Sequence, residues 1–292
     1  MSKWFACLLI FSALPPGLSH ALTAREVMER LEANQNASSE ALAFEMVLTD
    51  KSGFQRRRLV REFRLRNAGG LDDSLIFFDD PPDIRGSALL SRERADGWDD
   101  QWMFLPAVGK IRRIADSGRT DYFLGADLTF EDLSVEDIDH FSYRFAAPDT
   151  VVDGRVSASG ASSAGVSDAG RPAHVIDAVP ADTAAGRRSG YGLRRVYVDS
   201  DRSVILKTEY FDGGGKLIKV LSASQVKGYG SLWRADEVSV DNYARNHKTR
   251  LLVRARRLDV SFPPDLFTPR SLQRASVPEM LSRPTRTTPE TR

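Results

Sequence analysis

The sequence predicts a mainly β (α+β) protein built on one large antiparallel sheet, and two observations carry this prediction. Beyond residue 41, apolar residues recur at every second position in many short segments, which is the spacing of strands with one buried face. Turn-forming residues separate these segments at short intervals, which leaves no room for the crossover helices of a parallel sheet. The 292 residues fit one or two domains, and the uniform pattern favours one.

A single helix is expected before the sheet. Thr23 and Glu26 have the spacing of a capping box, and Val27, Met28 and Leu31 form an apolar stripe behind it. The alternating segments then predict strands over residues 41–49, 59–66, 75–78, 88–92, 98–105, 111–115, 141–145, 174–179, 193–199, 204–211, 217–227, 232–241 and 250–260. Helix-start signals over residues 129–132 and 134–137 predict short helical turns.

The first 21 residues predict a secretory signal peptide. Lys3 precedes an apolar run over residues 4–14 that is too short to span a bilayer, and small residues at positions 19 and 21 suit cleavage after Ala21. Cys7, the one cysteine of the sequence, lies inside this signal. We therefore expect a mature protein without disulfides, located in the periplasm.

Composition excludes several classes of function. The chain has 41 Lys and Arg against 40 Asp and Glu, and this neutral balance argues against a nucleic acid partner. No later apolar run approaches the roughly 20 residues of a membrane-spanning helix, so we expect a soluble mature chain. His140, His174 and His247 lack the spacing of a zinc site, and nothing indicates a metal, a cofactor or a catalytic residue.

The segment GADLTFEDL, residues 125–133, gathers three carboxylates, those of Asp127, Glu131 and Asp132. Paired carboxylates serve other proteins as general acid and base or as ligands of hard cations, so a hydrolase that uses this corner is one hypothesis. No further acidic cluster supports it. Acids in the first turn of a helix also cap free N–H groups, and we favour that structural interpretation.

Six arginines between residues 56 and 66 form the strongest local concentration of charge. They suit lipid headgroups or an acidic partner, or else a solvated face that protects an edge strand. Glu62 and the acidic pair at residues 72–73 dilute the charge, which favours the edge strand.

Large aromatic side chains are expected to share the concave side of the sheet. A sheet of this size with few helices must roll up, leave an apolar hollow or bind an apolar molecule. We therefore predict a partly open apolar cavity. Its expected lining is Phe44, Phe63, Phe77, Trp98, Trp102 and Phe104.

A series of motifs resembles a known family. The segments PPDIRGSALL (81–90), LPA (105–107), KIRRI (110–114), GAD (125–127) and FEDL (130–133) occur in this order, with Trp98 and Trp102 between the first two. This order resembles the outer membrane lipoprotein-sorting proteins, a branch of the LolA/LolB-like carriers. The family usually has serine where this chain has Ala126, which removes a hydroxyl from the acidic corner.

The resemblance implies a LolA-like fold, an unclosed antiparallel β-barrel wrapped around short helices, with a cavity for acyl chains and no catalytic residues. The function it implies is a periplasmic carrier that binds a lipid, lipoprotein acyl chains or another apolar molecule and hands it on, toward the outer membrane. The alternative is an accessory or sensor subunit of an inner-membrane RND/MMPL-type exporter without its own cargo. We expect a monomer. A structural corner at the cavity mouth would consist of Gly125, Asp127, Phe130, Glu131, Asp132 and Leu133.

The expected domain organisation has three parts. Residues 1–21 form the signal peptide, residues 22–268 the barrel and residues 269–292 a flexible tail. Residues 149–173 are rich in serine, alanine and glycine and are expected to form a flexible insertion within the barrel.

Overall fold

The computed structural model describes residues 22–35, 37–134, 138–152 and 170–273. The predicted signal peptide lies outside these ranges. None of the helices within them is long and apolar enough to cross a membrane. The described chain forms one 13-stranded sheet with the order β6-β5-β4-β3-β2-β1-β13-β12-β11-β10-β9-β8-β7, antiparallel at every step.

The elements follow one another along the chain as the alternating pattern predicts. The strands are β1 (Ser39–Thr49), β2 (Gln55–Arg66), β3 (Asp72–Asp80), β4 (Ala88–Glu93), β5 (Asp99–Leu105), β6 (Lys110–Arg113), β7 (Phe141–Val152), β8 (Arg171–Pro180), β9 (Leu193–Asp199), β10 (Ile205–Phe211), β11 (Leu217–Tyr229), β12 (Leu232–Asn242) and β13 (His247–Leu258). The helices are α1 (Ala24–Gln35) and α2 (Thr183–Ser189), with 3₁₀ turns η1 (Asp116–Gly118), η2 (Phe123–Gly125), η3 (Glu131–Leu133), η4 (Ile138–His140) and η5 (Pro269–Gln273).

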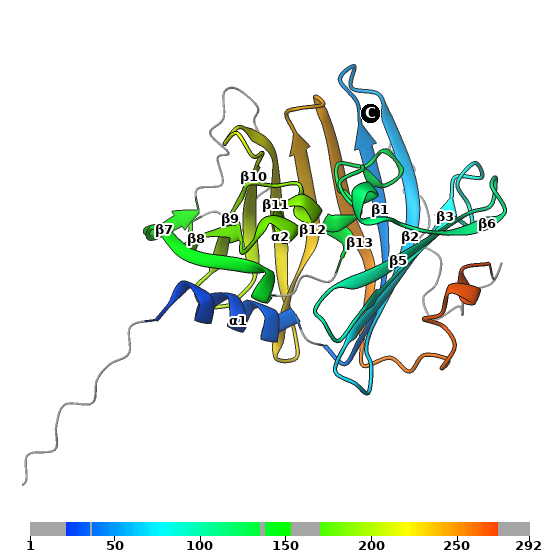
Figure 1. Cartoon of the computed structure of the whole chain (residues 1–292), viewed down its shortest axis with the longest axis horizontal. Helices are drawn as coiled ribbons and strands as arrows, with labels where there is room; N and C mark the ends of the chain where they lie inside the picture. The colour runs from blue at the N-terminus through cyan, green and yellow to red at the C-terminus, as the bar shows by residue number, and fades with distance from the viewer. Residues whose placement is uncertain (1–21, 36, 135–137, 153–169, 274–292) are drawn as a thin grey trace, which may run out of the picture.

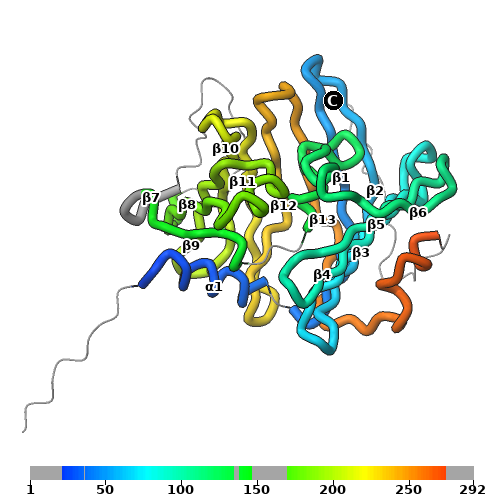
Figure 2. The backbone as a smooth tube through the Cα atoms, viewed as in Figure 1, coloured from blue at the N-terminus to red at the C-terminus, as the bar shows by residue number. Residues whose placement is uncertain are grey.

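The sheet is an unclosed barrel, as predicted. β1 pairs with β2 on one side and with β13 on the other, so the first and last strands meet at the middle of the sheet (Figure 1). The two ends are β6 and β7, and no ladder joins them in the described chain. The trace in Figure 2 shows both halves of the sheet extending outward from β1 and β13.

α1 packs on the inner side of the half that contains β7 to β12. The capping box is confirmed, because the backbone N–H of Thr23 donates to Glu26 at 2.7 Å and that of Glu26 to the Thr23 hydroxyl at 3.2 Å. The predicted stripe is buried against Ile176 and Val196. At the other end of α1, Arg234 donates to the last carbonyl groups of the helix, at 2.6 Å to Asn34 and 3.1 Å to Gln35, which satisfies acceptors that a helix end leaves free.

The other half of the sheet is covered on both faces. On the inner face, Phe44, Met46 and Val60 pack with Phe123 and Phe130 from the segment between β6 and β7. On the outer face, a different cluster packs under the chain that follows β13. Its buried members are Ala41, Ala43, Phe63, Leu75, Phe77, Ala88, Leu90, Leu266, Phe267 and Leu272.

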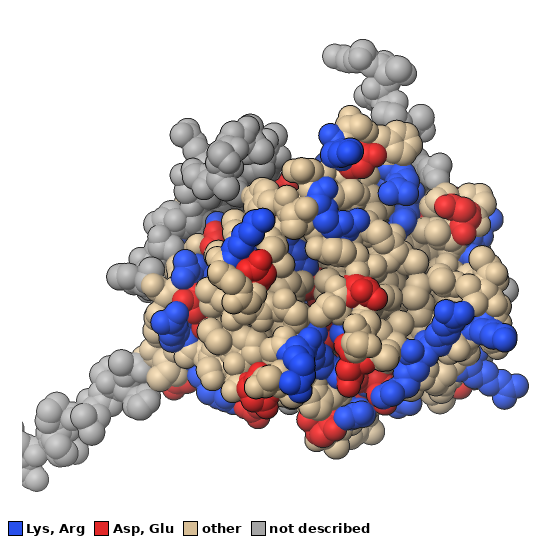
Figure 3. Space-filling model, turned by 45° about the horizontal axis from the view of Figure 1, so that its top comes forward, with Lys and Arg blue, Asp and Glu red and all other residues tan. Residues whose placement is uncertain are grey.

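The prediction that the arginine-rich segment is an edge strand is wrong, because β2 lies between β3 and β1. Several of its arginines are instead paired. Arg61 contacts Asp79 through two hydrogen bonds of 2.6 and 2.7 Å, and Arg57 reaches the buried Glu45 at 2.7 Å. Internal strands tolerate such cations because neighbouring strands supply the carboxylates. Figure 3 shows basic and acidic side chains interspersed on the surface in view.

α2 was not predicted, although its signals are in the sequence. Asp182 accepts a hydrogen bond from the backbone N–H of Ala185 at 2.8 Å as an N-cap. Gly190 ends the helix with a left-handed φ of 72°, and a Cβ at this glycine would lie 2.6 Å from Thr120. Only glycine therefore fits where α2 meets the inner segment.

The ends of the two predicted flexible regions contain regular structure. β7 continues to Val152 and β8 begins at Arg171, while residues 153–169 of the predicted insertion lie outside the described residues. Beyond residue 268, η5 packs Leu272 into the outer cluster, and residues 274–292 are outside the described chain.

Candidate ligand-binding site

A cavity of about 130 Å³ lies between α1 and the inner face of the sheet. Its walls come from α1, the turn η4 and the strands β7, β9 and β10, and they combine a mainly apolar surface with several polar side chains. The lining residues are Met28, Leu31, Glu32, Gln35, Ile138, Tyr143, Arg194, Val196, Ile205, Thr208 and Tyr210. A dry apolar cavity of about 150 Å³ accepts a molecule the size of benzene, so this space accommodates a comparable portion of an apolar ligand.

Arg194 places a cation beside the apolar walls. The guanidinium is stacked over Phe141 at 4.7 Å and Tyr191 at 5.3 Å and donates to the Ser189 hydroxyl at 3.2 Å. Such stacking lets a buried guanidinium retain favourable electrostatics in an apolar wall. Burial raises the pKa of the nearby Glu131 carboxyl, and Arg194 is one of the cations that oppose this shift. Burial also acts to raise the pKa of Asp132, but the cations around it, Arg194 among them, lower that pKa overall.

The helix start predicted at residues 129–132 is confirmed as η3. Asp132 in this turn also has a partner that the sequence did not indicate. The backbone N–H of Thr129 donates to Asp132 at 2.7 Å, and that of Asp132 to the Thr129 hydroxyl at 3.1 Å. The same carboxylate forms a buried ion pair with Lys219 and accepts a 3.0 Å hydrogen bond from Tyr191. Burial tends to raise the pKa of Asp132, but Lys219 outweighs it and lowers that pKa.

Asp127 anchors the acidic corner to the sheet. Its carboxylate is completely buried and accepts a hydrogen bond from the Thr249 hydroxyl at 2.7 Å. Nδ1 of His247 lies 2.6 Å from the same carboxylate, and the Arg245 guanidinium lies 3.4 Å from it. The backbone supports this position, because Leu124 and Gly125 both have left-handed φ values, 45° and 77°. Asp127 is thus held by several partners on and before β13, which fits the structural interpretation of this corner.

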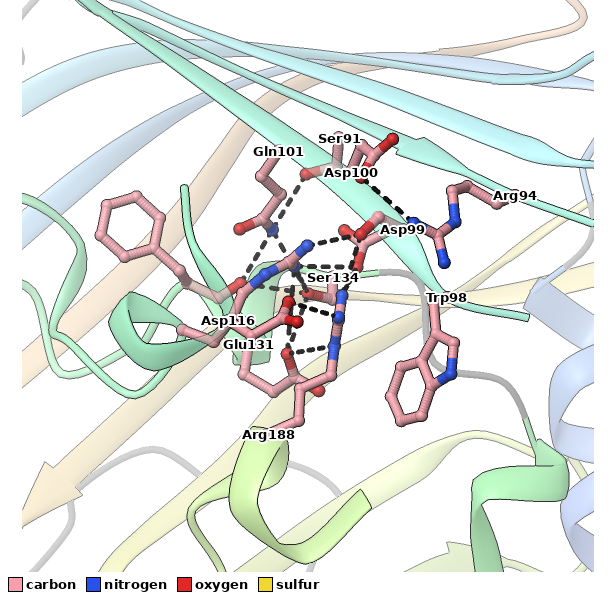
Figure 4. Close-up of polar contacts among 12 residues, drawn as sticks. Ser91, Arg94, Trp98, Asp99, Asp100, Gln101, Asp116, Glu131, Ser134 and Arg188 are labelled. Carbon is pink, nitrogen blue, oxygen red and sulfur yellow. Dashed lines mark hydrogen bonds and ion pairs between the residues drawn. The ribbon is translucent and has the colours of Figure 1, made fainter. Parts of the chain in front are cut away.

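A second polar cluster surrounds Glu131 (Figure 4). Asp99 accepts from both Arg119, at 2.8 Å, and Arg188, at 2.7 Å. The carboxylate of Glu131 lies 3.9 Å and 3.5 Å from these two arginines. Burial raises the pKa of Glu131 to about 7, although Arg188 and Arg119 oppose the shift.

Trp98 completes this cluster. Arg188 lies over the Trp98 ring at 4.6 Å, and the ring of His140 stacks on it at 3.6 Å. Below we call this cluster the clasp. It consists of Trp98, Asp99, Arg119, Glu131, His140 and Arg188.

The structure divides the six predicted cavity residues among three places. Four of them, Phe63, Phe77, Trp102 and Phe104, belong to the outer cluster beneath residues 260–272. Phe44 faces the inner side and packs with Phe123 and Phe130, while Trp98 belongs to the clasp. The alternation of β5 does place Trp102 and Phe104 on one face, as expected. It could not indicate which side of a covered sheet is concave.

The predicted corner residues lie near the cavity but are not among its lining residues. Phe130 and Leu133 point into the inner cluster, and Tyr191 links the corner to the cavity wall, since it bonds Asp132 and contacts Tyr210 with ring centroids 4.9 Å apart. The second predicted helix-start, residues 134–137, falls mostly outside the described residues. Within the described chain, no group of three or more histidine, cysteine, aspartate or glutamate residues is arranged to hold a metal ion.

Comparisons with known proteins agree with this architecture. An outer membrane lipoprotein-sorting protein domain from Vibrio parahaemolyticus superimposes with a TM-score of 0.73 at 26% identity, covering 86% of this chain and 98% of that one. A DUF1329 family protein from Desulfovibrio piger gives 0.75 at 22% identity, with the same coverage of both chains. A LolA superfamily protein from Nitrosomonas europaea gives 0.62 at 15% identity, over 85% and 98% of the two chains. No curated protein matches the sequence.

The fold and these likenesses define a LolA-like open barrel, so the resemblance stated from the motifs is confirmed. A family model whose description reads "Uncharacterized protein" matches residues 70–274. The chain belongs to that family.

Proposed function

We propose that this protein is a periplasmic carrier that binds the apolar part of a lipid or of a lipoprotein between α1 and the sheet. The observation that carries the proposal is the cavity of about 130 Å³ with mainly apolar walls beside α1. Each CH₂ group moved from water into such a space gains roughly 0.8 kcal/mol. A partner protein that buries the apolar part of the ligand slightly more completely would then receive the ligand without any chemical step.

The position of α1 supports binding of longer chains. Met28 and Leu31 occupy the inner side of the sheet and line the cavity. An acyl chain longer than the present space requires these side chains to move, and a helix end fixed by Arg234 gives α1 a pivot. The likeness to a lipoprotein-sorting domain agrees with this class of ligand.

Lipid extraction and a filled-cavity variant test the proposal. Organic extracts of the purified protein should contain a reproducible lipid by mass spectrometry, and the dye N-phenyl-1-naphthylamine should bind and fluoresce. Ile205→Trp, which fills the cavity, should abolish both. Val204→Trp is the matched control, because Val204 is equally half-buried but packs in another cluster. A well-folded protein that carries no lipid and does not bind the dye would refute the proposal.

The partner that we propose is an inner-membrane exporter of the RND/MMPL type, and the support for it is the family resemblance. Pull-down from solubilised membranes with the wild-type protein and Ile205→Trp identifies whether a partner binds and whether it requires the cavity. Retention of the same exporter by both proteins would instead favour an accessory subunit without cargo.

A further inference from the structure

We infer that the cavity selects an apolar ligand that carries an acidic group, a carboxylate or a phosphate, and that Arg194 binds this group. The inference rests on the proposed function, because it names the class of ligand that the same cavity takes. Its structural basis is the arrangement of polar and apolar side chains around the cavity and the way in which the guanidinium of Arg194 is held.

Polar side chains form a row across the inner face of the sheet at the cavity. In the ladder between β9 and β10, Arg194 is paired with Tyr210 and Val196 with Thr208. Arg194 and Val196 share a face because residues two apart in a strand point the same way, and all four residues line the cavity. The row of Arg194 and Tyr210 continues across β8 to Tyr143 of β7, another lining residue. One guanidinium and two phenol rings are thus brought to the same side of the cavity.

Apolar side chains form the side of the cavity next to α1. Met28 and Leu31 of α1 pack with Val196, and Ile138 and Ile205 pack against the same cluster. All five residues line the cavity. Because α1 crosses the strands of this half of the sheet (Figure 1), this apolar lining runs alongside the polar row. An elongated ligand can therefore lie along α1 and present a polar end to Arg194.

The guanidinium of Arg194 is held in place before a ligand arrives. The residue is 7% exposed, and its guanidinium lies over the rings of Phe141 and Tyr191 and donates to the Ser189 hydroxyl. A group that is fixed in this way loses little conformational freedom on binding. Because a guanidinium carries its N–H donors in a planar fork, it suits the paired oxygens of a carboxylate or a phosphate.

The acidic groups around the cavity leave this position suited to an added negative charge. Among the described residues that line the cavity, Glu32 alone is acidic, and it is exposed on α1, where water weakens its field. Two buried acids respond to the charge of Arg194. Asp132 is already paired with Lys219, and burial raises the pKa of Glu131 to about 7, which leaves this carboxyl partly neutral.

The cation in the wall distinguishes an acidic ligand from a neutral lipid. A wholly apolar ligand would exclude water from the cavity side of the Arg194 guanidinium and give no charge in return, which is costly for a buried cation. An anion replaces that water with a charge-assisted hydrogen bond. The cavity volume of about 130 Å³ favours one chain over two as the apolar part of such a ligand.

Displacement of N-phenyl-1-naphthylamine from the wild-type protein by octanoic acid, octyl phosphate and methyl octanoate at pH 8 tests the inference. At least one of the two acids should bind about tenfold more tightly than the ester, because only the acids form a charge-assisted hydrogen bond. A cavity without a cation would instead prefer the ester, which is the most apolar of the three. The tighter of the two acids shows whether the natural group is a carboxylate or a phosphate.

Three variants test the role of Arg194 itself. Arg194→Met should remove the preference for the acids and leave binding of the ester within about threefold of the wild type. Arg194→Lys should retain part of the preference, because the charge remains but the planar fork is lost. Arg195→Met is the matched control, since the side chain of the next residue points to the other face of β9 and pairs with Asp177 at 2.7 Å. Its affinities should match those of the wild type.

The outcomes separate this inference from the proposed function. Binding of the ester by the wild type as tightly as the acids would overturn the inference and leave the carrier function standing. An unchanged preference for the acids in Arg194→Met would do the same, because the acidic group would then be bound elsewhere. A wild-type protein that binds neither the dye nor any of the three compounds would overturn the proposed function, and this inference with it.

Discussion

Glu131 is a carboxyl that the fold keeps partly protonated near neutral pH. Burial raises its pKa to about 7 from an ordinary value of 4.5. The folded state therefore binds a proton more tightly than the unfolded state between these two values, and stability falls as pH rises through this window. Ionised Glu131 costs the folded state on the order of 1–3 kcal/mol above pH 7.

Glu131→Gln should remove this pH dependence. We expect the variant to be at least as stable as the wild type at pH 8 and similar to it at pH 5. Urea unfolding followed by tryptophan fluorescence at the two pH values measures the difference. A wild-type protein that becomes more stable between pH 5 and pH 8 through this residue would contradict the prediction.

Lys219 and Asp132 form a pair in which each member depends on the other. Lys219→Met should destabilise the protein by about 3–5 kcal/mol, because it leaves the buried Asp132 carboxylate without its cation. Adding Asp132→Asn should recover most of the loss, since an amide oxygen still accepts from the Thr129 N–H. Equal stabilities of the single and double variants in urea unfolding would show that the pair does not act as a unit.

At the scale of elements, the chain after β13 serves as a cover for the outer face. Leu266, Phe267 and Leu272 pack over Phe63 and Phe77, which would otherwise expose a broad apolar patch. Of these three residues, Leu272 lies in the tail over residues 269–292, which is predicted to be flexible from its proline, threonine and arginine content, and that composition obscured this apolar side chain. A few well-placed apolar residues are enough to order a segment without regular periodicity.

Leu272→Ala should therefore cost about 2–5 kcal/mol in the free energy of unfolding, as is typical for a buried leucine. Thermal and urea unfolding measure the loss, and dye binding to the exposed outer face should increase. Val108→Ala in the exposed turn before β6 is the control and should change stability by less than about 0.5 kcal/mol. A loss as small as that of the control would show that the segment does not cover this face.

For the whole molecule, sequence alternation predicted the single antiparallel sheet, and the family resemblance implied that this sheet forms an unclosed barrel. Each of the 13 strands overlaps a predicted segment. The prediction works because a strand with one buried face has an apolar residue at every second position. The capping box of α1 was equally readable, since both partners lie within four residues. The site was not. Arg119, Arg188 and Lys219 belong to no recognisable motif in the sequence, and they lie far along the chain from their partners Asp99 and Asp132, which only the folded sheet brings to them.

A continuous sheet should unfold as one unit despite its size. Trp102 belongs to the half that contains β5 and Trp233 to the half that contains β12, so each reports on one side of the shared β1–β13 ladder. Variants that retain one of these two tryptophans should show the same urea midpoint by fluorescence. Two separate midpoints would mean that the halves are independent units.

The ladder between β1 and β13 also sets the order in which the molecule can fold. Glu45 and Arg254, which pair across it, are 209 residues apart in the chain. During synthesis from the N-terminus, β1 can pair with β2 at once but must wait for nearly the whole chain before its second neighbour exists. Contacts of such long sequence separation make folding slow, and the waiting strand presents an open hydrogen-bonding edge to any other chain. The nascent protein is therefore most exposed to aggregation until its last strand has been made.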